Sequence, residues 1–484
     1  MLFNSNEFIF LFLPIAFAGY FFLNTKVSIL AAKVWIILAS LFFYSWWNIN
    51  YLPLIIISIL VNFFISQALM KDPVHKKLFL LAGLAFNIGL LGYFKYMDFF
   101  IKNFNWGFGT DIPLLHLALP LAISFYTLQQ IAYLVDSYGG LVKEKKFLNY
   151  TIFVTFFPQL IAGPIVHHKE MMPQFASLKT KLLNYDNIAL GFFIFSLGLF
   201  KKVVIADTFS TWANPGFAHA EALNLIEAWI TSLSYTFQLY FDFSGYTDMA
   251  IGAALLFNIK LPQNFNSPYK ATGLIDFWQR WHMTLTRFIT TYIYKPFLKS
   301  LGTVTFEKAM IATIFTMLIA GIWHGAAWTF VIFGILHGLA IAINHYWKKN
   351  KIHLPVWLAW FITFNFLNFS FVIFRAEDME TALSMFRSMF GANGLILSEK
   401  YFGFLASFQD GFFTFSEVYS HINGHASTTF SIILAFLTIL LFKNSTAFLK
   451  EFKSTNVSLV FGMFLFLIAT SFMSRISEFL YFNF

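Results

Sequence analysis

The chain has 484 residues, of which 58% are hydrophobic and 11% are charged, with 32 Lys and Arg against 23 Asp and Glu. An average soluble protein is about 25% charged, so these charges are too few to cover the surface of a soluble protein of this size. Disordered proteins and nucleic-acid-binding proteins also need more charge, and both classes are excluded. No cysteine is present, which excludes disulfides, thiolate metal sites and cysteine nucleophiles. The composition therefore predicts an all-α polytopic membrane protein.

Apolar runs long enough to approach a membrane span recur along the whole chain. A spanning helix needs about 20 mostly apolar residues, and runs of this kind lie near 7–23, 29–47, 52–70, 78–97, 114–136, 150–166, 186–206, 226–257, 307–323, 327–346, 354–374, 429–442 and 456–473. The first run lacks a basic region and a cleavage site, so we expect it to be retained. The run at 150–166 contains Pro158 and Pro164 and is expected to re-enter the membrane. About ten to twelve spans are predicted, with re-entrant and interfacial helices.

Basic residues cluster in three of the predicted loops. The clusters are Lys71, Lys76 and Lys77, then Lys143, Lys145 and Lys146, and finally Lys348, Lys349 and Lys351. The positive-inside rule places these loops in the cytoplasm and the N-terminus outside. Counting the spans alternately inward and outward from these loops places the long segment 376–428 on the external face. There it forms either a docking surface or interfacial helices that cover the bundle. We expect one domain over 1–484, with N-terminal helices in 1–140, a catalytic core in 150–346 and C-terminal helices in 429–484.

Two carboxylates, Asp242 and Asp248, interrupt the apolar run at 226–257, with Ser244 between them. Placing an ionisable group inside a membrane costs free energy, so such a group is taken first as a candidate functional residue. The alternative is a structural ion pair. Six residues correspond to about 240° around a helix. The two carboxylates are therefore not expected to act as a catalytic pair.

A polar segment follows, with a loop at 262–269 that includes Asn266. After this loop, one polar stripe recurs at helical spacing through Asp276, Arg280, Thr284, Arg287, Thr291 and Lys295. This pattern predicts one amphipathic helix at the cytoplasmic interface, with an i,i+4 pair between Asp276 and Arg280. Its basic residues are expected to meet lipid headgroups or a phosphate-bearing donor. His282, next to Trp281, lies off the stripe and is either a packed side chain or a site residue.

A second histidine, His324, follows Trp323 deep in an apolar run and is surrounded by glycines and alanines that let another backbone approach closely. A buried imidazole stays neutral readily and can act as a base. A structural role is the alternative. His337 lies 13 residues on, about 220° out of phase on a continuous helix. The two histidines can share a site only if the helix breaks at the glycines.

Several motifs together resemble the membrane-bound O-acyltransferase (MBOAT) family, in particular its bacterial branch that acetylates polysaccharides such as peptidoglycan and alginate and, more distantly, the teichoic-acid D-alanyl transferases. They are MLFNSNEFIFLFLPIAF at the start, SFYTLQQIAYLVDSYGG at 124–140, FFPQLIAGPIV at 156–166, YFDFSGYTDMAIG at 240–252, NFNSPY and DFWQRWHMTLTRF within 264–288, GIWHGAAWTFVIFGILHG at 321–338 and FLYFNF at the end. The segment 289–297 departs from the alginate-type pattern. The resemblance therefore implies no particular polysaccharide.

The resemblance implies a ring of tilted helices around a central tunnel, with His324 as the catalytic histidine and His282 as a second site histidine. It further implies an acyl transfer from a cytoplasmic thioester, acetyl-coenzyme A, to a hydroxyl, with no bound cofactor and no metal. Residues expected to line the donor site or the tunnel are Trp323, Trp281, Arg280, Arg287, Asp242, Ser244, Asp248 and Asn266.

The expected setting is the bacterial cytoplasmic (inner) membrane, in contact with membrane lipids and with no nucleic-acid partner. By the same resemblance, the acetyl group passes through an extracytoplasmic acetyltransferase partner, either SGNH-like or of the kind that serves alginate acetylation, to a polysaccharide acceptor. Two alternatives are a D-alanyl or lipid acyl transferase of the same family and, in a different class, a membrane transporter.

Overall fold

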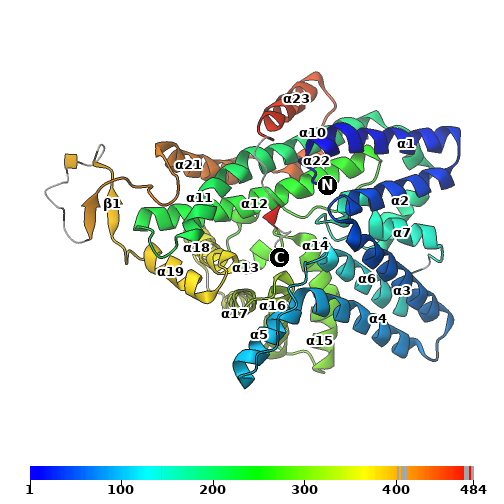
Figure 1. Ribbon diagram of the computed structural model, residues 1–484, viewed down its shortest axis with the longest axis horizontal. Coiled ribbons are helices and arrows are strands. Elements are labelled where there is room, and N and C mark those ends of the chain that lie inside the picture. The colour runs from blue at the N-terminus through cyan, green and yellow to red at the C-terminus, as the bar shows by residue number, and fades with distance from the viewer. Residues whose placement is uncertain (143, 400–402, 405–408, 410–411, 474–478, 481–484) are drawn as a thin grey trace.

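The computed structural model describes residues 1–142, 144–399, 403–404, 409, 412–473 and 479–480. Lys143 of the second basic cluster and the final four letters of the closing motif lie outside these residues. The regular structure of the described chain is helical (Figure 1), apart from one short parallel pair of strands, β1 (Leu395–Leu397) and β2 (Phe413–Phe415). The predicted all-α membrane fold is confirmed.

The N-terminal helices are η1 (Glu7–Phe12), α1 (Leu13–Lys26), α2 (Ile29–Ser45), η2 (Ile49–Tyr51), α3 (Leu52–Lys71), α4 (Lys76–Leu91), η3 (Gly92–Tyr96), α5 (Met97–Phe108) and α6 (Ile123–Tyr138). Most of them lie at the right of Figure 1, and α5 lies at its lower centre. The Ser28 hydroxyl accepts a hydrogen bond from the amide of Ala31 and so caps α2. The apolar run at 114–136 is helical only from Ile123, and the residues of the run before it have no regular structure.

The centre of the fold is the long helix α12 (Leu225–Leu256), which is buried along nearly its whole length. Before it come α7 (Phe147–Thr155), α8 (Phe157–Leu160), α9 (His168–Ala176), η4 (Leu178–Lys181), α10 (Tyr185–Phe200), η5 (Lys201–Ala206) and α11 (Asp207–Ala218). Helix α10 packs directly on α12, because a Cβ at Gly198 would lie only 2.6 Å from the carbonyl oxygen of Gly245. Phe156 interrupts the run at 150–166 between α7 and α8, next to Pro158. This run is a broken helix, and its re-entry into the membrane stays a prediction.

The polar segment after α12 is not the single amphipathic helix that its periodicity predicts. It consists of η6 (Pro268–Lys270), α13 (Leu274–Trp278), α14 (Met283–Ile289), η7 (Thr290–Tyr294) and α15 (Lys295–Ser300). The helix breaks at His282, which has left-handed backbone angles (φ 42°, ψ 51°). At this break the amide of Met283 donates to the carbonyl oxygen of Asn264. Tertiary hydrogen bonding therefore overrides the local pattern.

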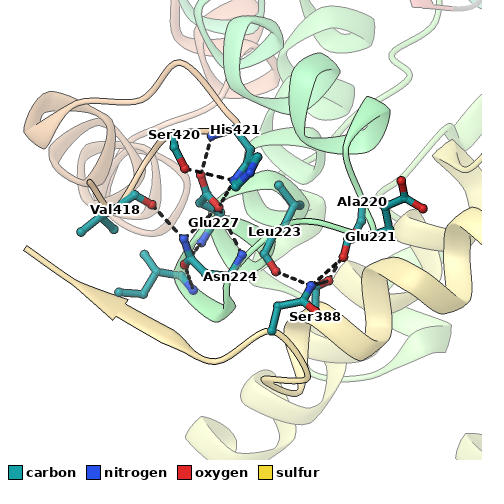
Figure 2. A network of polar contacts seen from close by, with 11 residues as sticks. Ala220, Glu221, Leu223, Asn224, Glu227, Ser388, Val418, Ser420 and His421 are labelled. Carbon is teal, nitrogen blue, oxygen red and sulfur yellow. Dashed lines mark hydrogen bonds and ion pairs between the residues drawn. The ribbon is translucent and has the colours of Figure 1, made fainter. Parts of the chain in front are cut away.

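Three helices follow, α16 (Phe306–His324), α17 (Trp328–Lys349) and α18 (Val356–Arg375), and then α19 (Met379–Met389), α21 (Ala426–Leu441), α22 (Ser445–Glu451) and α23 (Asn456–Ser471). The described residues of the 376–428 segment pack at the N-terminal end of α12, at the left of Figure 1. Figure 2 shows the polar network that holds them there. In it, the buried Glu227 carboxylate accepts hydrogen bonds from the backbone amide of His421 (2.8 Å) and from the side-chain amide of Asn224 (2.8 Å). The segment is thus anchored to the core.

Seven helices in the described part of the chain are long and apolar enough to cross a bilayer, as judged by length and composition alone. They are Glu7–Lys26, Ile49–Lys71, Lys76–Phe108, Tyr185–Ala218, Phe306–His324, Trp328–Lys349 and Val356–Arg375. The bent pair Ser427–Leu441 and Ser445–Glu451 makes an eighth if it forms one span, and Ile29–Ser45 and Asn456–Ser471 are apolar but shorter. This is fewer than the ten to twelve predicted, because some apolar runs are broken or only partly helical.

The basic loops lie at one end of the bundle. The Lys76 ammonium is 5.2 Å from the ring of Tyr138, at the end of α6. The Lys349 ammonium is 4.1 Å from the ring of Phe306, at the start of α16. Between these two places, the hydroxyl of Tyr292 on η7 donates to Asp136, close to the end of α6 (3.0 Å). These contacts place the loops of Lys76 and Lys349 at one basic end of the molecule.

Candidate active site

His324 is the last residue of α16, directly before a break in the helix. Gly325 has an extended backbone, and α17 begins at Trp328. Because the helix breaks here, the phase difference that a continuous helix would impose on His324 and His337 does not apply. The ring of Phe333 contacts both imidazoles, at centroid distances of 6.3 Å and 4.3 Å.

The small residues around His324 bring the two helices into backbone contact. A Cβ at Gly321 would lie 2.8 Å from the Cα of Gly334, which is closer than side-chain atoms approach. The His324 side chain is buried, with its ring edge-on to Phe374 at 5.2 Å and to Trp323 at 5.0 Å. The expected close approach of another backbone is confirmed. At the tip of the α16–α17 hairpin the two helix backbones are in direct contact.

Lys95, on η3, holds the carboxyl end of α16. Its ammonium donates to the carbonyl oxygens of Trp323 (2.7 Å) and His324 (3.0 Å), and to the hydroxyl of Ser124 (3.3 Å). The neighbouring Tyr96 hydroxyl donates to the carbonyl of Ile322 (2.8 Å). A helix leaves its last four carbonyls without intrahelical partners, and a cation there is favourable. The sequence analysis missed this residue, although a lone lysine in the apolar run at 78–97 is a signal for such a role.

A cavity of about 310 Å³ opens beside this contact. Its lining combines η3 and the start of α5 with the break between α16 and α17, through Lys95, Asp98, Gly325, Ala326, Ala327 and Phe330 among others. The cavity therefore gives access to the backbone next to His324. It opens away from the basic end, since Lys95 lies about five turns along the span from Lys76.

His282 is fully buried at the start of α14 and packs edge-on against Phe243 of α12 at 4.8 Å. Its Nδ1 lies 3.1 Å from the side-chain oxygen of Asn264. The indole of Trp323 contacts both site histidines, at 6.4 Å from the His282 ring and 5.0 Å from the His324 ring. The break at 282 and the break after 324 thus bring two imidazoles from distant parts of the chain against the same aromatic ring.

Trp281 lies on the other side of this aromatic cluster. Its ring stacks on Phe277 (5.5 Å) and Tyr269 (6.2 Å) and is buried. Unlike Trp323, it has no ring contact with His324 among the described residues. The structure therefore brings Trp323 to both histidines and places Trp281 in the packing around α13.

The two arginines predicted to face a donor are both ion-paired. The Arg280 guanidinium pairs with Asp276 (2.7 Å), so the predicted i,i+4 pair is confirmed. The Arg287 guanidinium forms a two-pronged pair with Glu170 on α9, with one hydrogen bond of 2.9 Å. Both arginine side chains are about one-third exposed. They lie near the surface and are already neutralised by a carboxylate.

The carboxylates on α12 bind buried lysines of η5. Asp248 pairs with Lys201 (2.7 Å), and Asp242 pairs with Lys202 (2.7 Å), which also contacts Asp207 (2.8 Å). These contacts correspond to the structural alternative, in which each carboxylate serves a separate ion pair. The carboxylates also hold the C-terminal part of the chain, because Asp242 accepts from the amide of Leu480 (3.1 Å) and Asp248 from the hydroxyl of Ser445.

The other two polar candidates lie in different surroundings. Ser244 is buried on α12, and its hydroxyl has no hydrogen-bond partner among the described residues. The side-chain oxygen of Asn266 accepts from Asn444 (2.8 Å), away from the histidines. The asparagine that reaches His282 is Asn264, two residues earlier, which the sequence analysis did not select.

His337 makes hydrogen bonds through both ring nitrogens. The Trp278 indole N–H donates to Nδ1 (3.2 Å), and Nε2 lies 3.0 Å from the hydroxyl of Ser370 on α18. Since an indole can only donate, Nδ1 must accept and Nε2 carries the proton. His337 therefore ties α13 to α17 and α18, which is a structural role.

A further polar cluster lies at the basic end. The Tyr292 hydroxyl contacts Nδ1 of His167 (3.0 Å) as well as Asp136. Burial, together with the nearby Arg287 charge, lowers the pKa of His167 to about 4. Within the described residues, no group of three or more His, Asp or Glu side chains is arranged to hold a metal ion.

The fold and this site define a polytopic helical membrane protein with two buried histidines beside the tip of a broken helical hairpin. A family model described as MBOAT, the membrane-bound O-acyltransferase family, matches residues 137–376. The chain is 47% identical to the peptidoglycan O-acetyltransferase of Helicobacter pylori, over 100% of this chain and 98% of that protein. The chain belongs to the membrane-bound O-acyltransferase family and is an O-acyltransferase.

Two further relatives mark the breadth of the similarity. The chain is 36% identical to the probable alginate O-acetylase AlgI of Pseudomonas aeruginosa, over 82% of this chain and 76% of that protein. It is 30% identical to the teichoic acid D-alanyltransferase of Bacillus subtilis, over 53% of this chain and 69% of that protein. These proteins carry the names of different acyl groups and acceptors. All three names are those of acyl-transferring enzymes, and none is that of a transporter.

Proposed function

We propose that this protein moves an acetyl group from acetyl-coenzyme A in the cytoplasm to hydroxyls of peptidoglycan outside the bacterial inner membrane. The observation that carries the proposal is the pair of buried histidines, His282 and His324, in a chain similar over its full length to a peptidoglycan O-acetyltransferase. The basic end of the bundle faces the cytoplasm by the positive-inside rule. The cavity beside Lys95 then opens toward the acceptor side.

The proposed chemistry needs a base for the acceptor. A hydroxyl attacks a thioester carbonyl poorly unless its proton is removed in the same step. We assign this role to the His324 imidazole. The hydroxyl oxygen bonds to the acetyl carbon, the carbon–sulfur bond breaks, and the departing thiolate takes the proton from the His324 imidazolium. No cysteine is present in the chain, so the acetyl group cannot rest on a cysteine of this protein.

The acceptor of this step is a serine or tyrosine hydroxyl of an extracytoplasmic partner of the SGNH type, which then acetylates the glycan. The short external cavity favours a side chain over a polymer, because its volume of about 310 Å³ is at the low end for small-molecule sites. We assign the docking of this partner to the described residues of the 376–428 segment, which are anchored through Glu227.

The proposal is tested by deleting the gene in its host and restoring it. Acetate and D-alanine released from purified peptidoglycan and from the other cell-envelope polymers by mild base are then measured. We expect acetate from peptidoglycan to fall on deletion and to return on restoration. Loss of acetate from an exopolysaccharide instead would assign an alginate-like acceptor, and loss of esterified D-alanine would assign the D-alanyl transferase alternative.

A further inference from the structure

Asn264 lies directly against His282, in the loop that follows α12. The asparagine is 1% exposed and the histidine 0%. The side-chain oxygen of Asn264 is the meeting point of three contacts: His282 Nδ1 at 3.1 Å, the backbone amide of Thr284 at 3.2 Å and the Thr284 hydroxyl at 2.9 Å. The surroundings of this oxygen decide how the histidine is protonated.

The backbone amide of Thr284, which can only donate a hydrogen bond, fixes the orientation of the Asn264 side-chain amide. A backbone N–H has no acceptor function, so the atom that faces the Thr284 amide must be the oxygen and not the NH₂ group. The Thr284 hydroxyl agrees with this assignment, because it accepts from the amide of Ile165 (3.0 Å) and so directs its own proton to Asn264. A flipped asparagine would turn its NH₂ group toward the Thr284 amide, which can only donate, and would lose that contact.

Once the oxygen is fixed, the tautomer of His282 is fixed as well. An amide oxygen only accepts, so Nδ1 of His282 must carry a proton. A fully buried imidazole is kept neutral by the cost of burying its cation, and neutral imidazole carries one proton. Nε2 is therefore the unprotonated nitrogen.

We infer that Asn264 is a positioning residue that holds His282 as the Nδ1–H tautomer, so that Nε2 serves as a hydrogen-bond acceptor at the reaction centre. The inference rests on the proposed acetyl transfer for its functional meaning. A neutral His282 in this tautomer cannot donate from Nε2 to the acetyl carbonyl oxygen. Its Nε2 can instead accept a hydrogen bond from a donor group at the reaction centre, while His324 takes the proton of the attacking hydroxyl.

The purely structural alternative is that Asn264 only shapes the turn before α14. The backbone of Asn264 already does so, because its carbonyl oxygen accepts from the Met283 amide at 2.9 Å whatever the side chain is. Side-chain variants therefore separate the two roles.

The first test observes the tautomer without any assay of activity. The full-length protein in lipid nanodiscs is labelled with ¹⁵N-histidine, and the resonances of residue 282 are assigned by their loss in His282→Gln. We expect a protonated Nδ1 and an unprotonated Nε2. The opposite pattern would overturn the inference, while leaving the proposed function untouched.

The second test uses the pH profile of acetyl transfer. Asn264→Asp places a carboxylate beside the ring and stabilises the imidazolium, so His282 is protonated at a higher pH and the acidic limb of the kcat profile moves up. Asn264→Ala is expected to lose roughly 10- to 100-fold in kcat, the range known for groups that orient functional histidines in metal sites. The control is Asn368→Asp on α18, where the buried amide bonds Thr236 (2.7 Å) and not a histidine.

The acidic limb of the Asn368→Asp profile should match the wild type. An unmoved limb in Asn264→Asp, or an equal shift in both variants, would contradict the positioning role. If Asn264→Asp does not fold, the ¹⁵N measurement on the wild-type protein still decides the tautomer. Absence of acetyl transfer in the wild type would refute the proposed function, and again not the tautomer.

Discussion

The ammonium group of Lys95 lies 3.0 Å from the carbonyl oxygen of His324, although 229 residues separate them in the chain. The lysine thereby fixes the backbone of the site histidine from a different helix. We predict that Lys95→Met leaves the carbonyl of His324 without this donor and the carbonyl of Trp323 with only the long contact to the Tyr96 hydroxyl (3.4 Å), which costs about 1–3 kcal/mol for a buried polar group. Acetyl transfer should fall about 100-fold, as expected when a catalytic group is displaced by about 1 Å.

Lys102→Met is the matched control, since Lys102 is exposed on α5 of the same span and has no hydrogen-bond partner in the described part of the chain. Both variants are compared for thermal unfolding and for transfer of labelled acetate in membranes. Equal activity of the two variants would show that the α16 terminus needs no cation.

This contact illustrates what the sequence could predict and what it could not. His282, His324 and the close backbone approach at the glycines around His324 were predicted from local residues. The break after His324 was not, because the phase argument assumed a continuous helix. Lys95 and Asn264 were not, because both act through hydrogen bonds to residues that lie far away in the chain. The same kind of contact explains why the regular polar stripe from 276 to 295 is not one helix: buried partners at 264 decide the backbone of 282.

The ion pairs between η5 and α12 are predicted to matter for folding. Lys201→Met leaves Asp248 buried without its cation, and breaking a buried pair by removing one partner costs about 3–5 kcal/mol. Lys201→Met with Asp248→Asn should recover part of that loss, because the uncompensated charge is gone. The measurement is the thermal midpoint of the detergent-solubilised protein.

Lys443→Met is the control for this pair. Its partner is Glu451, and both side chains are more than half exposed, so the loss should stay below about 1 kcal/mol. If Lys201→Met were as mild as Lys443→Met, the buried pair would not contribute to stability.

The ion pair between Arg287 and Glu170 allows a test of whether Arg287 binds the donor or only fixes one helix to another. If the guanidinium binds the phosphates of acetyl-coenzyme A, Arg287→Gln raises the KM for this donor, and Glu170→Gln, which frees the arginine, does not. We expect this asymmetry, measured as initial rates against donor concentration. A clamp that only fixes α9 onto α14 would give the same KM for both variants and the same fall in thermal midpoint.

The buried His167 is predicted to make the protein sensitive to acid. Its folded pKa is about 4, and an unfolded histidine titrates near 6.5. Between these values the unfolded state binds the extra proton, so stability falls as the pH is lowered from about 6.5 to about 4. His167→Gln lacks this titration, and its thermal midpoint should drop less between pH 7.5 and pH 5. His353→Gln, at an exposed side chain, should behave as the wild type does.

The last prediction separates the two histidines that share the Phe333 ring. His324→Ala should lower kcat by about 10²–10⁴-fold, the usual contribution of a general base. His324→Gln should not recover it, because an amide cannot take up a proton at neutral pH. His337 has both ring nitrogens occupied, by Trp278 and Ser370, so His337→Ala should instead lower stability by about 1–3 kcal/mol, the cost of leaving buried groups unpaired. It should retain far more activity per folded molecule than His324→Ala. Both variants are assayed for acetate transfer at matched membrane abundance, together with their thermal midpoints. An inactive but stable His337→Ala beside an active His324→Ala would reverse the assignment, and would place the base on α17 at the position that the hydrogen bonds describe as structural.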